Sequence, residues 1–259
     1  MEPEIRNIPF KEYLGLDRVS NSYLSKLASV PAKAKIKTEE TPSMAIGTAF
    51  HAYVLERNKF SNNIAVAPKV DRRTKAGKET WANFMAENAG KAVITEQDFL
   101  TVQSMSFAID AHPMASHLLL DGIAEQSVLW TDKETGIKCK ARPDFITDPA
   151  IIDLKSTRDA SVYGFMRSVM NFRYFQQAAM YLDAINAIPD YNQDEFIFIA
   201  VESSPPFRVE CYNMSIEFLE YGYFEYHRLL NLEKACREDG YYPHYSESGT
   251  TYLEKPKYL

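Results

Sequence analysis

The sequence predicts an α/β protein of the mixed (α+β) kind, in which a central mixed β-sheet is flanked by helices. The N-terminal part of the chain repeats its apolar residues at helical spacing. At Glu125 the pattern changes to that of strands, and a long helical segment then separates this strand group from a later strand pair. This order of elements is typical of a mixed sheet rather than of a doubly wound parallel sheet.

We expect the chain to form one domain. Its 259 residues are 46% hydrophobic, enough to bury a sizeable core. Residues 1–42 should form an N-terminal arm with a short helix, and residues 43–245 the core of the domain. Residues 246–259, with little periodicity, should be an extended C-terminal tail.

Caps and apolar spacing place the helices of the first half. The short helix begins at a Ser or Asn cap after Val19 and ends at Pro31. The next helix carries an apolar stripe that includes Phe50 and should face the core. After the short helix we expect a helix at 44–57 and a basic, turn-rich loop at 69–78. A helical segment up to about 90 and a helix at 96–112 should follow.

The second half should contain the sheet. A strand begins at Glu125, and the turn at Asp132–Gly136 joins it to a partner in a hairpin. A third strand follows, so that the three form a meander. The expected elements are strands at 125–130, 138–146 and 151–156, a long helix at 160–188, strands at 196–201 and 207–212, and a helix at 215–237.

Composition excludes several classes of protein. Lys and Arg number 29 and Asp and Glu 35, so the net charge of −6 cannot by itself hold the chain on nucleic acid. The three cysteines lie far apart, which argues against a disulfide framework or zinc knuckle and favours a reducing cytoplasm. We find no signal-peptide pattern and no apolar run of about 18 residues, so we expect neither secretion by that route nor a membrane span.

Asp153, Leu154 and Lys155 are the centre of the candidate site. On a strand, residues i and i+2 point to one face, so Asp153 and Lys155 should share a site while Leu154 enters the core. Such a pair taken alone is most often a surface ion pair. Two further carboxylates change this interpretation, because Asp144 lies on the preceding expected strand and Glu125 begins the one before it.

Three carboxylates at one sheet edge would repel one another. At about 4 Å each pair costs roughly 4 kcal/mol at an effective dielectric near 20, and one lysine cannot neutralise all three. The carboxylates must be protonated, bind divalent cations, or lie apart. Oxygen ligands with one imidazole favour Mg²⁺, for which Mn²⁺ should substitute. His51, one turn after Gly47, is the candidate imidazole, although a packed or surface histidine is more common.

A polar ridge on the long expected helix is the last candidate. Gln177 and Tyr181 are four residues apart, and Arg173 lies one turn earlier. A solvated helix face is the simplest explanation of this ridge. In the functional interpretation, Gln177 orients a scissile phosphate or a metal-bound water, Tyr181 packs beneath it or bonds to the backbone, and Arg173 touches a phosphate.

In their order along the chain, these motifs resemble the signature of the RecB-like nucleases of the PD-(D/E)xK superfamily. The sequence is most similar to the nuclease domain of RecE-type exonucleases (exonuclease VIII), over about Ser20 to Tyr245. The resemblance implies the restriction-endonuclease-like core of that superfamily. The motifs that carry it are Gly47-x-x-x-His51, Glu125, Arg142-Pro143-Asp144, Asp153-Leu154-Lys155 and Gln177-x-x-x-Tyr181, with longer similar stretches at 140–144, 153–157, 172–181 and 226–230.

The resemblance implies a Mg²⁺-dependent 5′→3′ exonuclease that acts on double-stranded DNA ends and leaves 3′ single-stranded tails. A RecT-like annealing protein would then use these tails in recombination. Lys155 would orient the attacking water, and a metal pair would stabilise the attacking and leaving oxygens. The implied metal ligands are His51, Asp144, Asp153, the carbonyl of Leu154, and Glu125 in direct contact or one shell further out.

The resemblance also implies partners and a setting. RecE-type enzymes are ring-shaped tetramers, so we expect a homo-oligomer in a bacterial cytoplasm, encoded by a phage or prophage. Local basic segments would line the DNA path and offset the acidic net charge. The candidate DNA contacts are Arg72, Arg73, Lys75, Lys78, Lys140, Arg142, Arg173 and Tyr181.

Two alternatives stay open. The same core can belong to a structure-specific or restriction-type endonuclease, which would cut closed circular DNA. It can also belong to a DNA-end-binding scaffold without catalysis, which would bind DNA but not turn it over. A Cas4-type nuclease is excluded, because its iron–sulfur cluster requires four cysteines and this chain has three.

Overall fold

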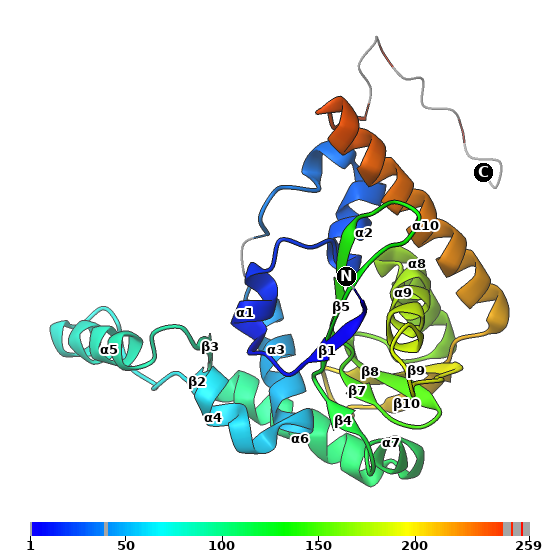
Figure 1. The fold of residues 1–259 in the computed structure, drawn as a ribbon. Coiled ribbons are helices and arrows are strands. Elements are labelled where there is room, and N and C mark those ends of the chain that lie inside the picture. Colours follow the sequence, from blue (N-terminus) through cyan, green and yellow to red (C-terminus); the bar gives the residue numbers. More distant parts are fainter. Residues whose placement is uncertain (1, 39–40, 246–249, 251–254, 256–259) are drawn as a thin grey trace.

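The computed structural model describes residues 2–38, 41–245, 250 and 255. It confirms the predicted fold class, because a central mixed sheet lies between helices (Figure 1). The helices are α1 Phe10–Gly15, α2 Asn21–Ser29, α3 Pro42–Leu55, α4 Phe60–Asn63, α5 Lys75–Glu87, α6 Glu96–Ala111, α7 Pro113–Leu118, α8 Val162–Phe172, α9 Tyr174–Asn186 and α10 Ile216–Asp239. The strands are β1 Glu4–Arg6, β2 Ile64–Val66, β3 Ala92–Ile94, β4 Ile123–Ala124, β5 Ser127–Thr131, β6 Lys138–Ala141, β7 Phe145–Ile146, β8 Ala150–Thr157, β9 Glu195–Glu202 and β10 Val209–Asn213.

The central sheet has five strands in the order β10-β9-β8-β7-β4. Strands β8 and β9 are parallel, with Asp153 opposite Phe198, and the other neighbours are antiparallel. The first five residues of β8 are all buried. This near-continuous apolar run is typical of a strand that is covered on both faces.

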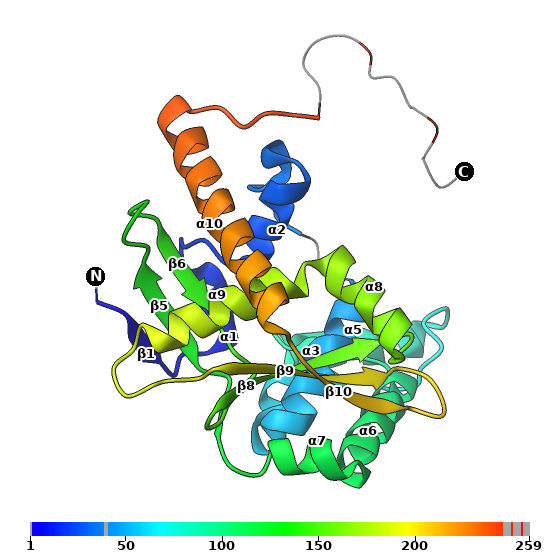
Figure 2. The ribbon, with the colours of Figure 1, turned by 90° about the vertical axis from the view of Figure 1, so that its right-hand side faces the viewer.

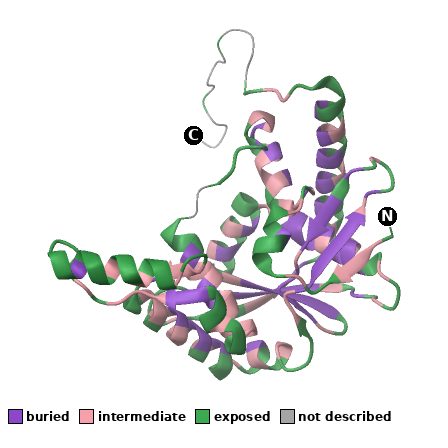
Figure 3. Ribbon diagram, turned by 60° about the vertical axis from the view of Figure 1, so that its left-hand side comes forward, coloured by how far each residue is buried: buried purple, intermediate pink, exposed green. Residues whose placement is uncertain are grey.

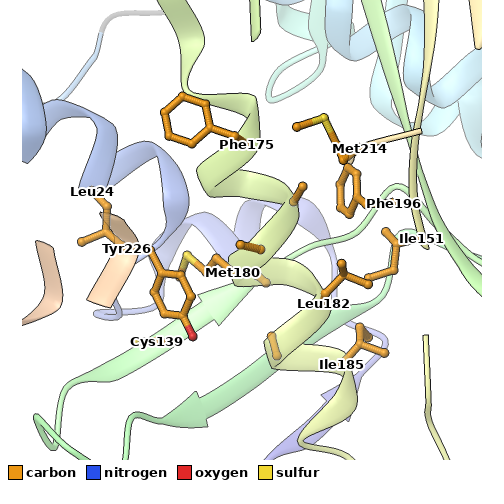
Figure 4. Close-up of a cluster of buried hydrophobic side chains, with 14 of the residues drawn as sticks. Leu24, Cys139, Ile151, Phe175, Met180, Leu182, Ile185, Phe196, Met214 and Tyr226 are labelled. Carbon is orange, nitrogen blue, oxygen red and sulfur yellow. The ribbon is translucent and has the colours of Figure 1, made fainter. Parts of the chain in front are cut away.

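Helices cover both faces of this sheet (Figure 2), with α8, α9 and α10 on one side and α3, α6 and α7 on the other. Because side chains alternate along a strand, Ile151 of β8 points to the face under α9, where it lies beside Leu182 and Phe196 (Figure 4). Ile152 and Leu154 instead pack with Phe50 of α3. Buried residues concentrate in the strands between the two layers (Figure 3).

A second sheet of order β1-β5-β6 contains the predicted hairpin. The side chain of Asp132 accepts a hydrogen bond of 2.7 Å from the backbone N–H of Thr135 in the turn. Gly136 follows in the left-handed region at φ 72°. The turn is therefore confirmed at its predicted position, whereas the third strand of this sheet, β1, was not predicted.

The long helix expected at 160–188 is two helices. Arg173 adopts φ 57°, which ends α8 and begins α9. A left-handed residue cannot continue a right-handed helix, so the axis changes direction there. The helices expected at 44–57, 96–112 and 215–237 are confirmed as α3, α6 and α10.

The predicted three-stranded meander is wrong. The expected strand 138–146 divides into β6 and β7, and these belong to different sheets. Pro143 lies at the division, where it has no N–H to donate to a strand ladder. Glu125 does not begin a strand either, because it lies between β4 and β5 with φ 53°. The expected strand 207–212 begins later, at Val209.

Several short elements were not predicted, among them α1, α4, α7 and the two-stranded parallel sheet of β2 and β3. Residues 246–259, expected as a tail, lie outside the described residues apart from 250 and 255. Within the described ranges, no helix has both the length and the apolar character to cross a membrane.

Candidate active site

Three side chains from separate parts of the chain meet at the edge of the five-stranded sheet. His51 lies on α3, Glu125 between β4 and β5, and Asp144 between β6 and β7. One ligand atom of each lies within 4.8 Å of the other two. The structure therefore brings together three of the predicted metal ligands.

Asp144 is held against β8 by a backbone hydrogen bond. Strand β7 pairs with β8 opposite Ile151 and Ile152, so the next part of β8 has an open edge on that side. There the N–H of Leu154 donates to Oδ2 of Asp144 at 2.8 Å. The N–H and C=O of a strand residue point to the same side, so the Leu154 carbonyl also faces this edge. This direction suits its predicted use as a metal ligand.

Asp153 and Lys155 lie on the face of β8 that α9 covers. The core residue Leu154 points to the opposite face. Asp153 and Lys155 form a buried ion pair. From α9, Nε2 of Gln177 donates to Oδ1 of Asp153 at 2.5 Å. The Lys155 ammonium also lies 4.7 Å from the ring centre of Tyr174. Tyr174 was not predicted to belong to the site, although it lies three residues before Gln177.

Arg142 fixes the position of Glu125. Its Nε donates to Oε2 of Glu125 at 2.6 Å, and its Nη1 donates to Oγ of Ser127 at 2.6 Å and to the carbonyl of Ile8 at 3.0 Å. The N–H of Glu125 donates to the carbonyl of Asp144 at 2.9 Å. Because the Arg142 side chain is only 8% exposed, it positions a carboxylate and is not free to bind DNA as predicted.

Burial and mutual repulsion oppose ionisation of two carboxyl groups. Burial and the nearby charge of Asp144 raise the pKa of Asp153 to about 6, although Lys155 opposes this shift. Burial and Asp144 also raise the pKa of Glu125. The pKa of Asp144 itself is lowered, because His51 and other hydrogen-bonding and charged neighbours outweigh its burial.

The pKa values of the two basic groups of the site, His51 and Lys155, are raised. Burial lowers the pKa of His51, but Asp144, whose Oδ2 is 3.3 Å from Nδ1, outweighs it and the pKa rises to about 9. The pKa of Lys155 is raised against its burial, chiefly by Asp153. Protonated His51 therefore supplies positive charge to the neighbouring carboxylates.

The donor set fits a hard divalent cation. Carboxylate oxygens of Glu125 and Asp144, one imidazole nitrogen and a backbone carbonyl edge are ligands that suit Mg²⁺ or Mn²⁺. The carboxylate of Asp153 adjoins this group but is engaged by Lys155 and Gln177. A cation held by His51, Glu125 and Asp144 would offset the charge of the carboxylates.

Lys140 was predicted to contact DNA, and the structure gives it another role. Its side chain enters the protein, where Nζ donates to the carbonyls of Tyr13 at 2.8 Å and Leu16 at 2.9 Å. The residue is 6% exposed. Lys140 therefore links the end of α1 to β6, and its ammonium group is not available to bind a phosphate.

Arg173 and Tyr181 also have internal partners. Arg173 pairs with Glu225 on α10 and donates from Nε to Oε1 of Gln176 at 2.8 Å, so its predicted phosphate contact is corrected to a structural role. Tyr181 is partly buried and packs against the core, with its ring centre 6.3 Å from that of Phe196. Packing is one of the two uses that the sequence suggests for Tyr181.

The remaining predicted DNA contacts lie away from the site. The segment between β2 and β3 carries them, on the turn before α5 and in its first turn (Figure 1). They are Arg72, Arg73, Lys75 and Lys78.

The fold and this cluster of carboxylates, lysine and histidine define a PDDEXK-like domain. The chain belongs to the family described as "PDDEXK-like domain of unknown function (DUF3799)", whose model matches residues 18–255. No curated protein sequence matches this chain.

A solved structure shares the fold. A crystal structure from Eubacterium rectale, named "Putative exonuclease", superposes with a TM-score of 0.63, and the match covers 97% of this chain and 96% of that chain. The two sequences are 13% identical, so the similarity demonstrates a common fold.

Proposed function

We propose that this protein is a metal-dependent exonuclease that degrades one strand of linear double-stranded DNA in the 5′→3′ direction. The observation that carries the proposal is the convergence of His51, Glu125 and Asp144 beside the Asp153–Lys155 pair. The PDDEXK-like family and the exonuclease name of the structural neighbour support nuclease chemistry. Direction and the use of DNA ends rest on the resemblance of the motifs to RecE-type enzymes.

Mg²⁺, with Mn²⁺ as a substitute, would be held by His51, Glu125, Asp144, Asp153 and the carbonyl of Leu154. When bound, such ions activate water and stabilise negative charge on the oxygens of the scissile phosphate. For Asp153 to serve as a ligand, its carboxylate has to share or leave its contacts with Lys155 and Gln177. Arg142 keeps Glu125 directed at the site, so that this carboxylate does not rotate towards solvent.

Lys155 acts as a charged donor in this proposal. Its raised pKa keeps the ammonium protonated at neutral pH, so it is poorly suited to remove a proton from water. It is suited to orient the attacking water and to stabilise charge that develops on the phosphate. Gln177 holds Asp153 from the opposite side and so keeps the carboxylate next to the lysine.

The experiment uses a linear duplex with a 5′ label on one strand and a 3′ label on the other, beside a closed circle. With Mg²⁺ we expect early release of the 5′ label, an intact circle, and no reaction in EDTA. Cutting of the circle would favour an endonuclease. Binding in Ca²⁺ without turnover in Mg²⁺ or Mn²⁺ would favour a scaffold.

We also propose that the 3′ tails pass to a RecT-like annealing protein and that the active form is a ring-shaped homo-oligomer in the cytoplasm of a bacterial host. The similarity to RecE-type enzymes supports both points. Mass determination in solution tests the assembly, and co-purification with an annealing protein encoded beside this chain tests the partner.

A further inference from the structure

The segment of residues 67–91 stands apart from the rest of the molecule, and we call it the α5 arm. It leaves the body after β2 and returns at β3, and these two parallel strands form its base. Helix α5 projects away from the sheet (Figure 1) and is almost entirely exposed (Figure 3). Among the α5 residues, all of them described, Gly77 alone is buried.

Packing within the protein does not explain this arm. In the described part of the chain, no other helix or strand packs extensively against α5. A helix of about 13 residues is only marginally stable without a packed face. The arm contains its own small contacts, with the guanidinium of Arg72 4.5 Å from the ring centre of Trp81 and Trp81 beside Phe84.

The charge of the arm is opposite to that of the chain. It contains six basic and three acidic residues, a net charge of +3, whereas the whole chain has a net charge of −6. The cations gather where they weaken the helix, because basic residues in a first turn meet the positive end of the helix dipole. Among the described residues Arg73 lies near Asp71, whereas Lys75 and Lys78 form no ion pair, so their charge is open to an external anion.

The location suits a long anionic ligand that also enters the candidate active site. Strand β3 packs against α3, the helix that carries His51, so the base of the arm adjoins an element of the site. An α5 of 13 residues spans about 20 Å, the length of roughly six base pairs. The residues nearer the site that were predicted to bind phosphate, Lys140, Arg142 and Arg173, are used inside the protein.

We propose that the α5 arm binds the backbone of duplex DNA several base pairs away from the scissile phosphate. Its basic residues contact phosphates without reading sequence, and the arm increases affinity and the number of nucleotides removed per encounter. This inference rests on the proposed function for its ligand. The arm lies outside the candidate catalytic centre, so it should affect KM and processivity but not the rate of the chemical step.

The test measures binding of a fluorescent 30-base-pair duplex in Ca²⁺, where cleavage does not interfere. The variant is Lys75→Ala/Lys78→Ala, because alanine preserves α5. The matched control is Lys133→Ala/Lys138→Ala, which removes the same charge from exposed positions of the β5–β6 hairpin. Circular dichroism confirms that each variant is folded.

We expect roughly tenfold weaker binding for the arm variant at about 0.1 M salt, and a salt slope reduced by up to about 2, with little change for the control. A duplex of about six base pairs should show a much smaller difference. Equal binding by the two variants would overturn the proposal. So would an arm variant that changes the oligomeric state but keeps the DNA affinity of the wild type. Because the assay needs no turnover, an inactive enzyme would refute the proposed function without deciding this result.

Discussion

The backbone N–H of Leu154 donates a hydrogen bond of 2.8 Å to Oδ2 of Asp144. This bond fixes a candidate metal ligand to the strand that carries Asp153 and Lys155. It forms because β7 ends before this part of β8, which leaves the N–H of Leu154 without a strand partner on that side. Because the N–H of Leu154 at this open edge needs an acceptor, Asp144 is held there, next to the strand position of Asp153.

The Asp144→Asn substitution tests the use of this carboxylate. Asparagine can still accept the Leu154 hydrogen bond but lacks the charge that a divalent ion requires, so the fold should persist. We expect cleavage to fall at least about 100-fold and Mn²⁺ affinity, measured by calorimetry, to fall with it. Glu134→Gln, on the exposed hairpin turn, is the control. Normal Mn²⁺ affinity in the Asp144 variant would remove this residue from the metal site.

His51 predicts a dependence of stability on pH in the absence of metal. Its pKa is raised to about 9 in the folded protein, above the usual 6.5. A raised pKa stabilises the fold fully below pH 6.5, and this contribution is lost as the pH rises through 9. Urea unfolding in EDTA should show this decline for the wild type and a flatter curve for His51→Gln. Parallel curves would show that the histidine is not linked to folding.

Arg142 should matter more for stability than an exposed arginine. In Arg142→Lys, the ammonium cannot reach Glu125, Ser127 and the Ile8 carbonyl together, so we expect a loss of about 2 kcal/mol in the free energy of unfolding. Arg6→Lys, in the exposed pair with Glu4, should cost less than about 1 kcal/mol. Equal effects in urea titrations would contradict the assigned role of Arg142.

Gln177 is predicted to position Asp153. In Gln177→Ala, Oδ1 of the buried carboxylate loses its donor, so the pKa of Asp153 should rise further above 6. The acidic limb of the pH–rate profile should therefore move to higher pH, with about a tenfold loss of rate at neutral pH. Gln176→Ala changes the neighbouring buried glutamine, which bonds to Asn21 and Arg173. It should lower stability without moving the profile.

The candidate site could be predicted largely from the sequence, because its residues carry local signals. Asp153 and Lys155 lie two positions apart on an apolar strand, a spacing that by itself places both on one face. Gln177 and Tyr181 follow one another on the same helix face. The order of these motifs along the chain predicted the similarity to nucleases of the PD-(D/E)xK superfamily.

Other features depend on contacts between distant parts of the chain. Lys140 appeared to be a DNA contact because nothing near it in sequence reveals that its ammonium group meets the end of α1. The positive φ of Glu125 and of Arg173 has no glycine or asparagine to signal it. The isolation of α5 depends on what does not pack against it, and its own sequence does not contain that information.

Cleavage by the Lys155→Ala variant tests the central claim most directly. The protein should fold normally and bind linear duplex DNA in Ca²⁺ as the wild type does, because the lysine is buried beside Asp153 rather than on the DNA-binding arm. With Mg²⁺ the wild type should degrade the duplex and the variant should not. Mg²⁺-dependent cleavage retained by Lys155→Ala would contradict the assignment of this site.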